Sequence, residues 1–99
     1  MKGNFNDLVN DDRVVIVDFH ALWCAPCRMQ SPILKEIASE LGERIKILKV
    51  DVDQNYEIAA RYGIQSVPTL IIFKNGEIKF RYSGVRTKAQ LMDDLKAIP

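Results

Sequence analysis

The chain contains only two cysteines, one histidine and no long hydrophobic run among its 99 residues. Two cysteines are too few for a disulfide-stapled secreted scaffold and agree better with a reducing compartment. The apolar stretch at residues 14–17 is too short to cross a bilayer, and residues 1–5 show no secretory signal. The 14 basic residues are scattered among 13 acidic ones, which gives no footprint for nucleic acid or for an anionic membrane. We therefore expect a cytoplasmic protein with neither of those partners.

The composition fits one compact domain. With 47% hydrophobic and 27% charged residues, the chain can bury one continuous core but is too short to divide in two. No internal repeat, low-complexity tract or linker interrupts it. We expect a single domain over residues 1–99.

Apolar residues alternate along the chain between the spacing of helices and that of strands. Residues 14–19 are almost wholly apolar, as a central strand covered on both faces would be. Asn75-Gly76 predicts a tight hairpin, and Thr87 with Gln90 predicts a capping box for a last helix. The pattern predicts an α/β fold in the order α-β-α-β-α-β-β-α. Its strands are expected at residues 14–19, 45–52, 69–73 and 78–82.

Both cysteines stand in the motif Trp23-Cys24-Ala25-Pro26-Cys27, between a predicted strand and a predicted helix. This spacing at a helix start brings the two sulfurs within one turn, where a disulfide can close and open reversibly. The positive end of the helix favours a thiolate at Cys24, so we expect Cys24 to be the exposed nucleophile and Cys27 its more sheltered partner. Pro26 suits the first helical turn, where its missing N–H has no partner. The motif therefore predicts thiol–disulfide exchange.

Two other interpretations of the cysteine pair are weaker. A zinc site would need two more ligands, and the chain offers only His20 and carboxylates. A purely structural disulfide would close a very short loop and so would add little stability.

Four segments together resemble the thioredoxin family: Val17-Asp18-Phe19, the cysteine motif, Val67-Pro68-Thr69 and Phe73-Lys74-Asn75-Gly76. The match runs from about Val14 to the C-terminus. The resemblance implies the thioredoxin fold, a three-layer α/β/α sandwich with a mixed sheet, in which the strand beginning at Thr69 is antiparallel to its neighbour. Only residues 1–3 precede the first predicted helix. The family's N-terminal edge strand is therefore expected to be missing, which leaves a sheet of about four strands with an open edge.

The resemblance also assigns catalytic roles beside Cys24 and Cys27. It implies that Asp18 lies buried behind Cys27 and close to Lys49. Burial would raise the pKa of the Asp18 carboxyl and Lys49 would lower it, so that Asp18 could take a proton from Cys27 through water. From the residue alone, Asp18 could instead be a strand-end charge that reaches solvent.

A further set of residues is expected to contact substrate. In the family the proline that matches Pro68 is cis and shapes the peptide-binding surface, although a trans proline at a strand start is the default from sequence. The backbone of Val67 could then pair with an extended client segment. Trp23 would join an apolar surface around Cys24, with ordinary packing as the alternative. The implied substrate-binding residues are Trp23, Ala25, Pro26, Val67, Pro68, Thr69, Gly84 and Val85.

The function that the resemblance implies is reduction of protein disulfides, as part of electron transport and cell redox homeostasis. The reaction would need no metal or bound cofactor, and NADPH would supply electrons through a thioredoxin reductase. The expected partners are that reductase and disulfide-containing client proteins, with the chain acting as a monomer. An oxidase or isomerase of the same fold and a non-catalytic binding subunit remain open. Ala25 replaces the usual glycine, which leaves the redox poise open. His20 replaces a usual aromatic residue, and could pack as a neutral group or change charge near the thiols.

Overall fold

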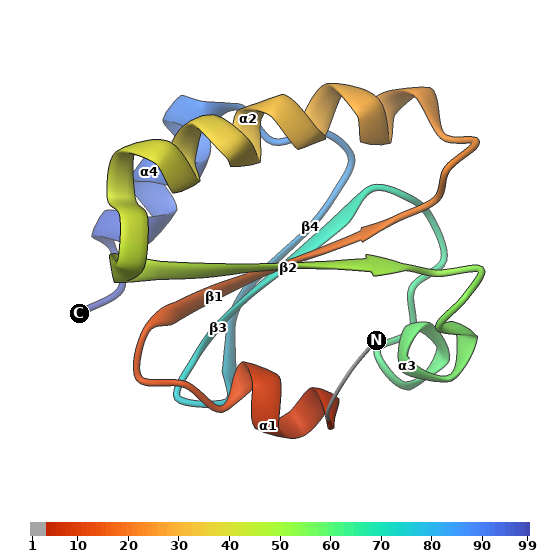
Figure 1. Ribbon diagram of the computed structural model, residues 1–99, viewed down its shortest axis with the longest axis horizontal. Coiled ribbons are helices and arrows are strands. Elements are labelled where there is room, and N and C mark those ends of the chain that lie inside the picture. Colours follow the sequence, from red (N-terminus) through yellow and green to blue (C-terminus); the bar gives the residue numbers. More distant parts are fainter. Residues whose placement is uncertain (1–3) are drawn as a thin grey trace.

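The structure is a computed structural model that describes residues 4–99. Four strands form the middle layer, with α2 and α4 on one face of the sheet and α1 and α3 on the other (Figure 1). The predicted order of elements is confirmed, with one short 3-10 helix added at Gly42–Arg44. The elements are α1 Phe5–Val9, β1 Val14–His20, α2 Ala25–Leu41, β2 Ile45–Asp51, α3 Tyr56–Arg61, β3 Thr69–Lys74, β4 Glu77–Ser83 and α4 Lys88–Lys96.

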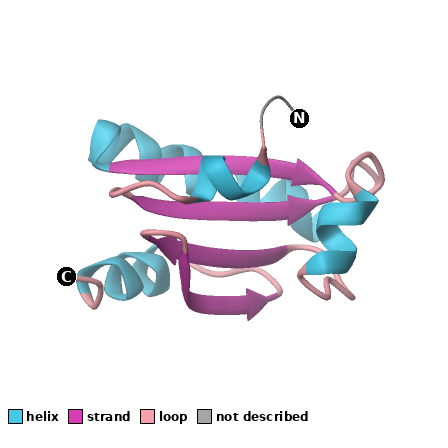
Figure 2. Cartoon of the chain, turned by 90° about the horizontal axis from the view of Figure 1, so that it is seen from below, coloured by secondary structure: helices cyan, strands magenta, loops and turns pink. Residues whose placement is uncertain are grey.

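The sheet is mixed, as the resemblance implied. Its strand order is β2-β1-β3-β4, and Figure 2 shows the four strands side by side. Strand β1 runs parallel to β2 and antiparallel to β3, which in turn is antiparallel to β4. Because β1 has a neighbour on each side, its carboxyl end is a firmly held base for the residues that follow it.

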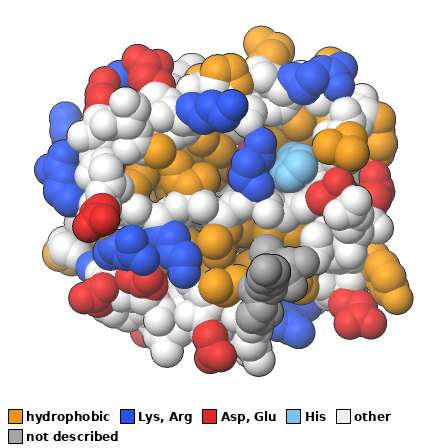
Figure 3. All heavy atoms as spheres, in the orientation of Figure 1, with side chains coloured by type: hydrophobic (Ala, Val, Ile, Leu, Met, Phe, Trp, Pro, Cys, Tyr) orange, Lys and Arg blue, Asp and Glu red, His pale blue; other side chains and the backbone are white. Residues whose placement is uncertain are grey.

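Strand β2 forms one edge of this sheet within the described residues. It lies in front in the view of Figure 1, and Figure 3 shows in the same orientation that basic side chains lie beside hydrophobic ones on this face. Lys46 and Lys49 stand among apolar residues along the strand. The open edge agrees with the expectation of a four-stranded sheet.

Side chains on the two faces of β1 belong to two separate hydrophobic clusters. On one face Phe5 anchors the short helix α1, with ring centroids 6.4 Å from Phe19, 5.3 Å from Tyr62 and 6.2 Å from Phe73. On the other face Ile16 packs under α2 and α4, in a cluster that includes Leu34, Ile37 and Leu91. Burial of these side chains supplies most of the driving force for folding. It also fixes both layers of helices against the sheet.

Local sequence signals account for the turns. Asn75 and Gly76 both have positive φ, 52° and 77°, as the tight turn between β3 and β4 requires. At the start of α4, the backbone N–H of Gln90 donates to Thr87 Oγ1 at 3.1 Å and the Gln90 side chain accepts from the Thr87 N–H at 3.0 Å. Both predictions are confirmed.

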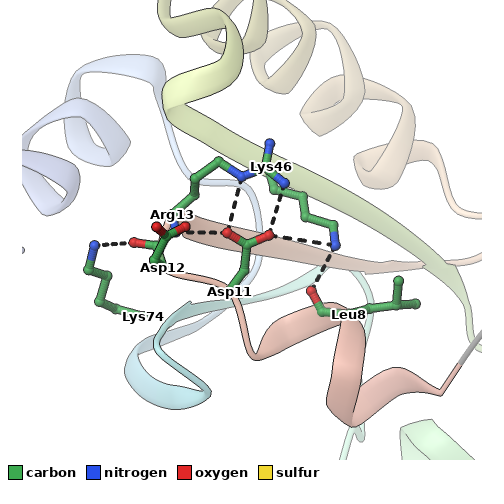
Figure 4. A network of polar contacts seen from close by, with 6 residues as sticks. All are labelled: Leu8, Asp11, Asp12, Arg13, Lys46 and Lys74. Carbon is green, nitrogen blue, oxygen red and sulfur yellow. Dashed lines mark hydrogen bonds and ion pairs between the residues drawn. The ribbon is translucent and has the colours of Figure 1, made fainter.

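A polar network holds the start of β1 in place (Figure 4). The Asp11 carboxylate accepts from Arg13 Nη2 at 2.9 Å and lies 4.0 Å from Lys46 Nζ on β2. Lys46 also donates to the carbonyl of Leu8 in α1 at 2.9 Å. The hydrogen bonds from Arg13 hold the pKa of Asp11 well below its usual range. The network thus joins α1, β1 and β2 at the end of the sheet away from the cysteines.

Candidate active site

The cysteine pair stands where the chain turns from the end of β1 into α2. Cys24 is the N-cap of that helix, with extended backbone, and its Sγ accepts the backbone N–H of Cys27 at 3.2 Å. The two residues form a disulfide with their Cα atoms 5.3 Å apart. Pro26 lies in the first turn, where a missing N–H costs nothing. The arrangement places Cys24 at the positive end of a helix of 17 residues, where a thiolate is favoured.

The expected difference in exposure between the two cysteines is wrong. Cys24 is 3% exposed and Cys27 is 5% exposed, so neither residue is open to solvent as a whole. The cover over Cys24 comes from a distant loop, because its Sγ lies 3.6 Å from the carbonyl oxygen of Val67. Ala21 packs against the pair from the β1 side. The exposed part of the motif is its rim, formed by Trp23, Ala25 and Pro26.

The loop that covers Cys24 contains the expected cis proline. The Val67–Pro68 peptide bond is cis, and Pro68 itself is buried at the start of β3. Its carbonyl accepts the N–H of Gly84 at 2.8 Å, which brings the segment after β4 to the same place. Thr69 is 1% exposed and donates from Oγ1 to the carbonyl of Ser66 at 2.8 Å. Thr69 therefore supports the loop from beneath rather than meeting solvent.

An apolar surface lies around the disulfide. Trp23 is 70% exposed, and its Nε1 donates to the Asp53 carboxylate at 2.9 Å, which orients the ring without burying it. Val85 adds a second exposed apolar side chain. Sequence reasoning missed two more exposed apolar residues, Leu22 next to Trp23 in the chain and Met29 on α2. Exposed apolar side chains gathered at one place are typical of a surface that binds another chain.

Asp18 is completely buried on the face of β1 that α2 covers. Neither carboxylate oxygen has a hydrogen-bond partner among the described residues. Burial raises the pKa of Asp18, while the charges of His20 and Lys49 oppose that rise. Lys49 pairs with Asp18 in the register of β2, but its ammonium donates to Ser31 Oγ at 2.6 Å rather than to the carboxylate. The surroundings of Asp18 therefore make its carboxylate a stronger base than a carboxylate in water.

A hollow of about 190 Å³ lies beside Cys27. It is large enough to hold water, and polar side chains are available there to bind it. His20 is half-buried and lines this hollow, so it lies on the side of the second cysteine. The lining residues are His20, Ala21, Leu22, Cys27, Arg28, Ser31 and Lys49.

Sequence reasoning also missed a buried polar group behind the motif. Gln30 is wholly buried on α2 and Asp94 is 7% exposed on α4. Gln30 follows Cys27 and precedes Leu34 at helical spacing, on a stripe that is otherwise buried and apolar. A lone amide on such a stripe was the available signal, because buried polar groups need partners.

Within residues 4–99, no three His, Cys, Asp or Glu side chains lie together as a set that could hold a metal ion. None of the helices described there is long and apolar enough to cross a membrane.

Comparison with known proteins gives consistent matches. The family model described as Thioredoxin matches residues 1–97. A thioredoxin from Rickettsia bellii is 45% identical over 93% of this chain and 88% of that protein. A thioredoxin from Bacillus subtilis is 45% identical over 81% of this chain and 77% of that protein. A solved structure titled "Structure of a malarial protein" superposes with a TM-score of 0.82 at 33% identity, over 86% of this chain and 96% of that one.

Proposed function

The chain belongs to the thioredoxin family, and from that premise we propose how its residues carry out dithiol–disulfide exchange on protein substrates. It is a dithiol–disulfide oxidoreductase of the protein-disulfide reductase type. The observation that carries the proposal is the Cys24–Cys27 disulfide at the N-terminus of α2, beside the cis Val67–Pro68 bond. Nothing in the structure or in the relatives favours an oxidase, an isomerase or a non-catalytic subunit.

In the first step, the Cys24 thiolate of the reduced pair attacks one sulfur of a client disulfide. The bond between the two client sulfurs breaks, and a bond between Cys24 and the client forms. The departing client thiolate takes a proton from water. The helix terminus and the N–H of Cys27, which lies 3.2 Å from Cys24 Sγ, support the thiolate before the attack.

In the second step, Cys27 attacks the Sγ of Cys24. The Cys27 thiol first gives its proton, through water, to the carboxylate of Asp18. The new Cys24–Cys27 bond expels the second client thiolate, which takes up a proton. Two electrons pass from the cysteine pair to the client, and the pair is left oxidised. The raised pKa of Asp18 suits this role, because a carboxylate whose conjugate acid has a raised pKa is a stronger base.

The client segment binds along the loop that covers Cys24. An extended peptide pairs with the backbone of Val67 beside cis Pro68, and Trp23 and Val85 provide apolar contacts. Ala25, Pro26 and Gly84 complete the exposed rim, and Thr69 holds the loop from below.

Turnover requires that the oxidised pair be reduced again. A thioredoxin reductase drawing on NADPH would supply the electrons, and no cofactor would be bound to this chain. We place the protein in the cytoplasm, acting as a monomer and as a single domain, where it would maintain protein thiols.

The reduction potential of the Cys24–Cys27 pair tests this function. The protein is equilibrated against a graded dithiol buffer, and its free thiols are counted by alkylation. A value near about −270 mV, which is the general reference value for thioredoxins, supports a reductase. A value of about −120 to −180 mV would instead indicate an oxidase or isomerase. If a variant that carries both Cys24→Ser and Cys27→Ser kept its biological activity, the protein would be a non-catalytic binding subunit.

A further inference from the structure

Gln30 is a wholly buried amide that the exchange reaction itself does not use. It lies on α2, three residues after Cys27, and reaches across to the segment between β4 and α4. Its Nε2 donates to the carbonyl of Arg86 at 3.0 Å, and its Oε1 accepts the N–H of Arg86 at 2.7 Å. One side chain thus satisfies both backbone groups of a residue 56 positions away.

The side chain of Arg86 is held from the opposite direction. Its Nε and Nη2 donate to the two carboxylate oxygens of Asp94 at 3.2 and 3.1 Å. The guanidinium lies 3.7 Å from the centroid of the Tyr82 ring, and the Tyr82 hydroxyl donates to Asp94 at 2.9 Å. A bidentate pair of this kind fixes direction as well as distance. Arg86 is therefore anchored to α2 by its backbone and to α4 by its side chain.

These anchors lie directly beside the proposed client-binding surface. Val85 and Gly84 precede Arg86, and the N–H of Gly84 donates to the carbonyl of Pro68 at 2.8 Å. Val67, before that proline, has its carbonyl 3.6 Å from Cys24 Sγ. The contacts therefore close a ring that runs from the disulfide through α2, the segment after β4 and the cis-proline loop, and back to the disulfide.

We propose that Gln30 is a positioning residue for client binding, which holds Gly84 and Val85 at a fixed place relative to the disulfide. This inference rests on the proposed function. An apolar side chain at position 30 would leave the N–H and carbonyl of Arg86 without partners. The segment would then shift until water satisfied them, and the conformation that binds a client would be populated less. Apparent affinity falls in proportion to that population. The chemistry at the sulfurs would be untouched, because the side chain of Gln30 hydrogen-bonds to Arg86 and to neither cysteine.

The test compares Gln30→Leu and Gln30→Met with a stability control, Val9→Ala. Both substitutions at position 30 keep approximate volume and remove the amide. Val9 is buried on the opposite face of the sheet, away from the ring of contacts. Each protein is assayed with insulin as a protein disulfide and with 5,5′-dithiobis(2-nitrobenzoate) as a small one. We expect the KM for insulin to rise about fivefold or more in the position-30 variants, the effect of losing roughly one net hydrogen bond.

Three further measurements distinguish the loss of a positioning contact from a general loss of stability. The rate with the small disulfide and the reduction potential should match the wild type. The amide of Arg86 should lose protection in hydrogen exchange, and Val9→Ala should leave the insulin KM unchanged. An unaltered insulin KM in both position-30 variants would overturn the inference, as would an equal rise in Val9→Ala. Failure of the wild type to reduce either disulfide would instead overturn the proposed function.

Discussion

Replacing Asp18 by asparagine should change the pH dependence of stability in a way that follows from its burial. The carboxyl is wholly buried with two unpartnered oxygens, and burial raises its pKa above the ordinary value of 3.8. In the unfolded chain the group ionises near that ordinary value. Between the two pKa values the folded state therefore holds a proton that the unfolded state has lost, so stability falls as pH rises.

The steepness of this fall has a fixed limit. One proton difference changes the free energy of unfolding by about 1.4 kcal/mol per pH unit. The contribution of Asp18 to the free energy of unfolding is intact below the pKa of the unfolded state. It declines as pH rises toward the pKa of the folded state and stays constant above that pKa. Asparagine carries no charge at any of these pH values and removes the decline. The free energy of unfolding of the variant, relative to that of the wild type, should therefore increase as pH rises from about 4.

Urea unfolding of the oxidised protein, at half-unit steps between about pH 3.5 and about pH 8, measures the effect. Asp93→Asn, which changes an exposed carboxylate on α4, serves as the matched control. The difference between Asp18→Asn and wild type should grow with pH, and the control should show no comparable growth. A difference that stays flat across the range would refute the reasoning, because it would mean that Asp18 titrates alike in both states.

Four other substitutions have definite expected outcomes. Cys27→Ser should accumulate a mixed disulfide with a client, seen on non-reducing gels after alkylation, whereas Cys24→Ser should form none; the reverse pattern would exchange their roles. Phe5→Ala should lower the free energy of unfolding by about 3 to 5 kcal/mol, because the ring is buried against three aromatic neighbours; a loss below about 1 kcal/mol in urea titration would contradict that packing. Asp53→Ala should free the indole of Trp23, the only tryptophan, and shift its fluorescence. An unchanged emission spectrum would mean that this hydrogen bond does not hold the ring.

Much of the fold could be predicted because its signals are local. The apolar run of β1, the Asn75-Gly76 turn and the Thr87–Gln90 capping box each depend on residues within a few positions of one another. The cysteine motif likewise predicts the start of a helix. The cis state of Pro68 followed only from resemblance, since sequence alone favours trans.

The parts that sequence reasoning missed or misjudged depend on contacts between distant segments. The exposure of Cys24 is set by the carbonyl of Val67, which stands 43 positions later. The amide of Gln30 can be buried only because the backbone of Arg86 supplies both of its hydrogen-bond partners. Apolar periodicity does not show such pairings, because the partners lie 43 and 56 positions apart in the chain.

The open edge of β2 bears on whether copies of this protein aggregate. Within the described residues this strand pairs with β1 on one side only, and unpaired strand edges are templates for the growth of sheets between molecules. Lys46 and Lys49 stand on that edge, where two like-charged strands would repel each other on approach. We expect these lysines to oppose such growth in concentrated solution, independently of the chemistry at the sulfurs.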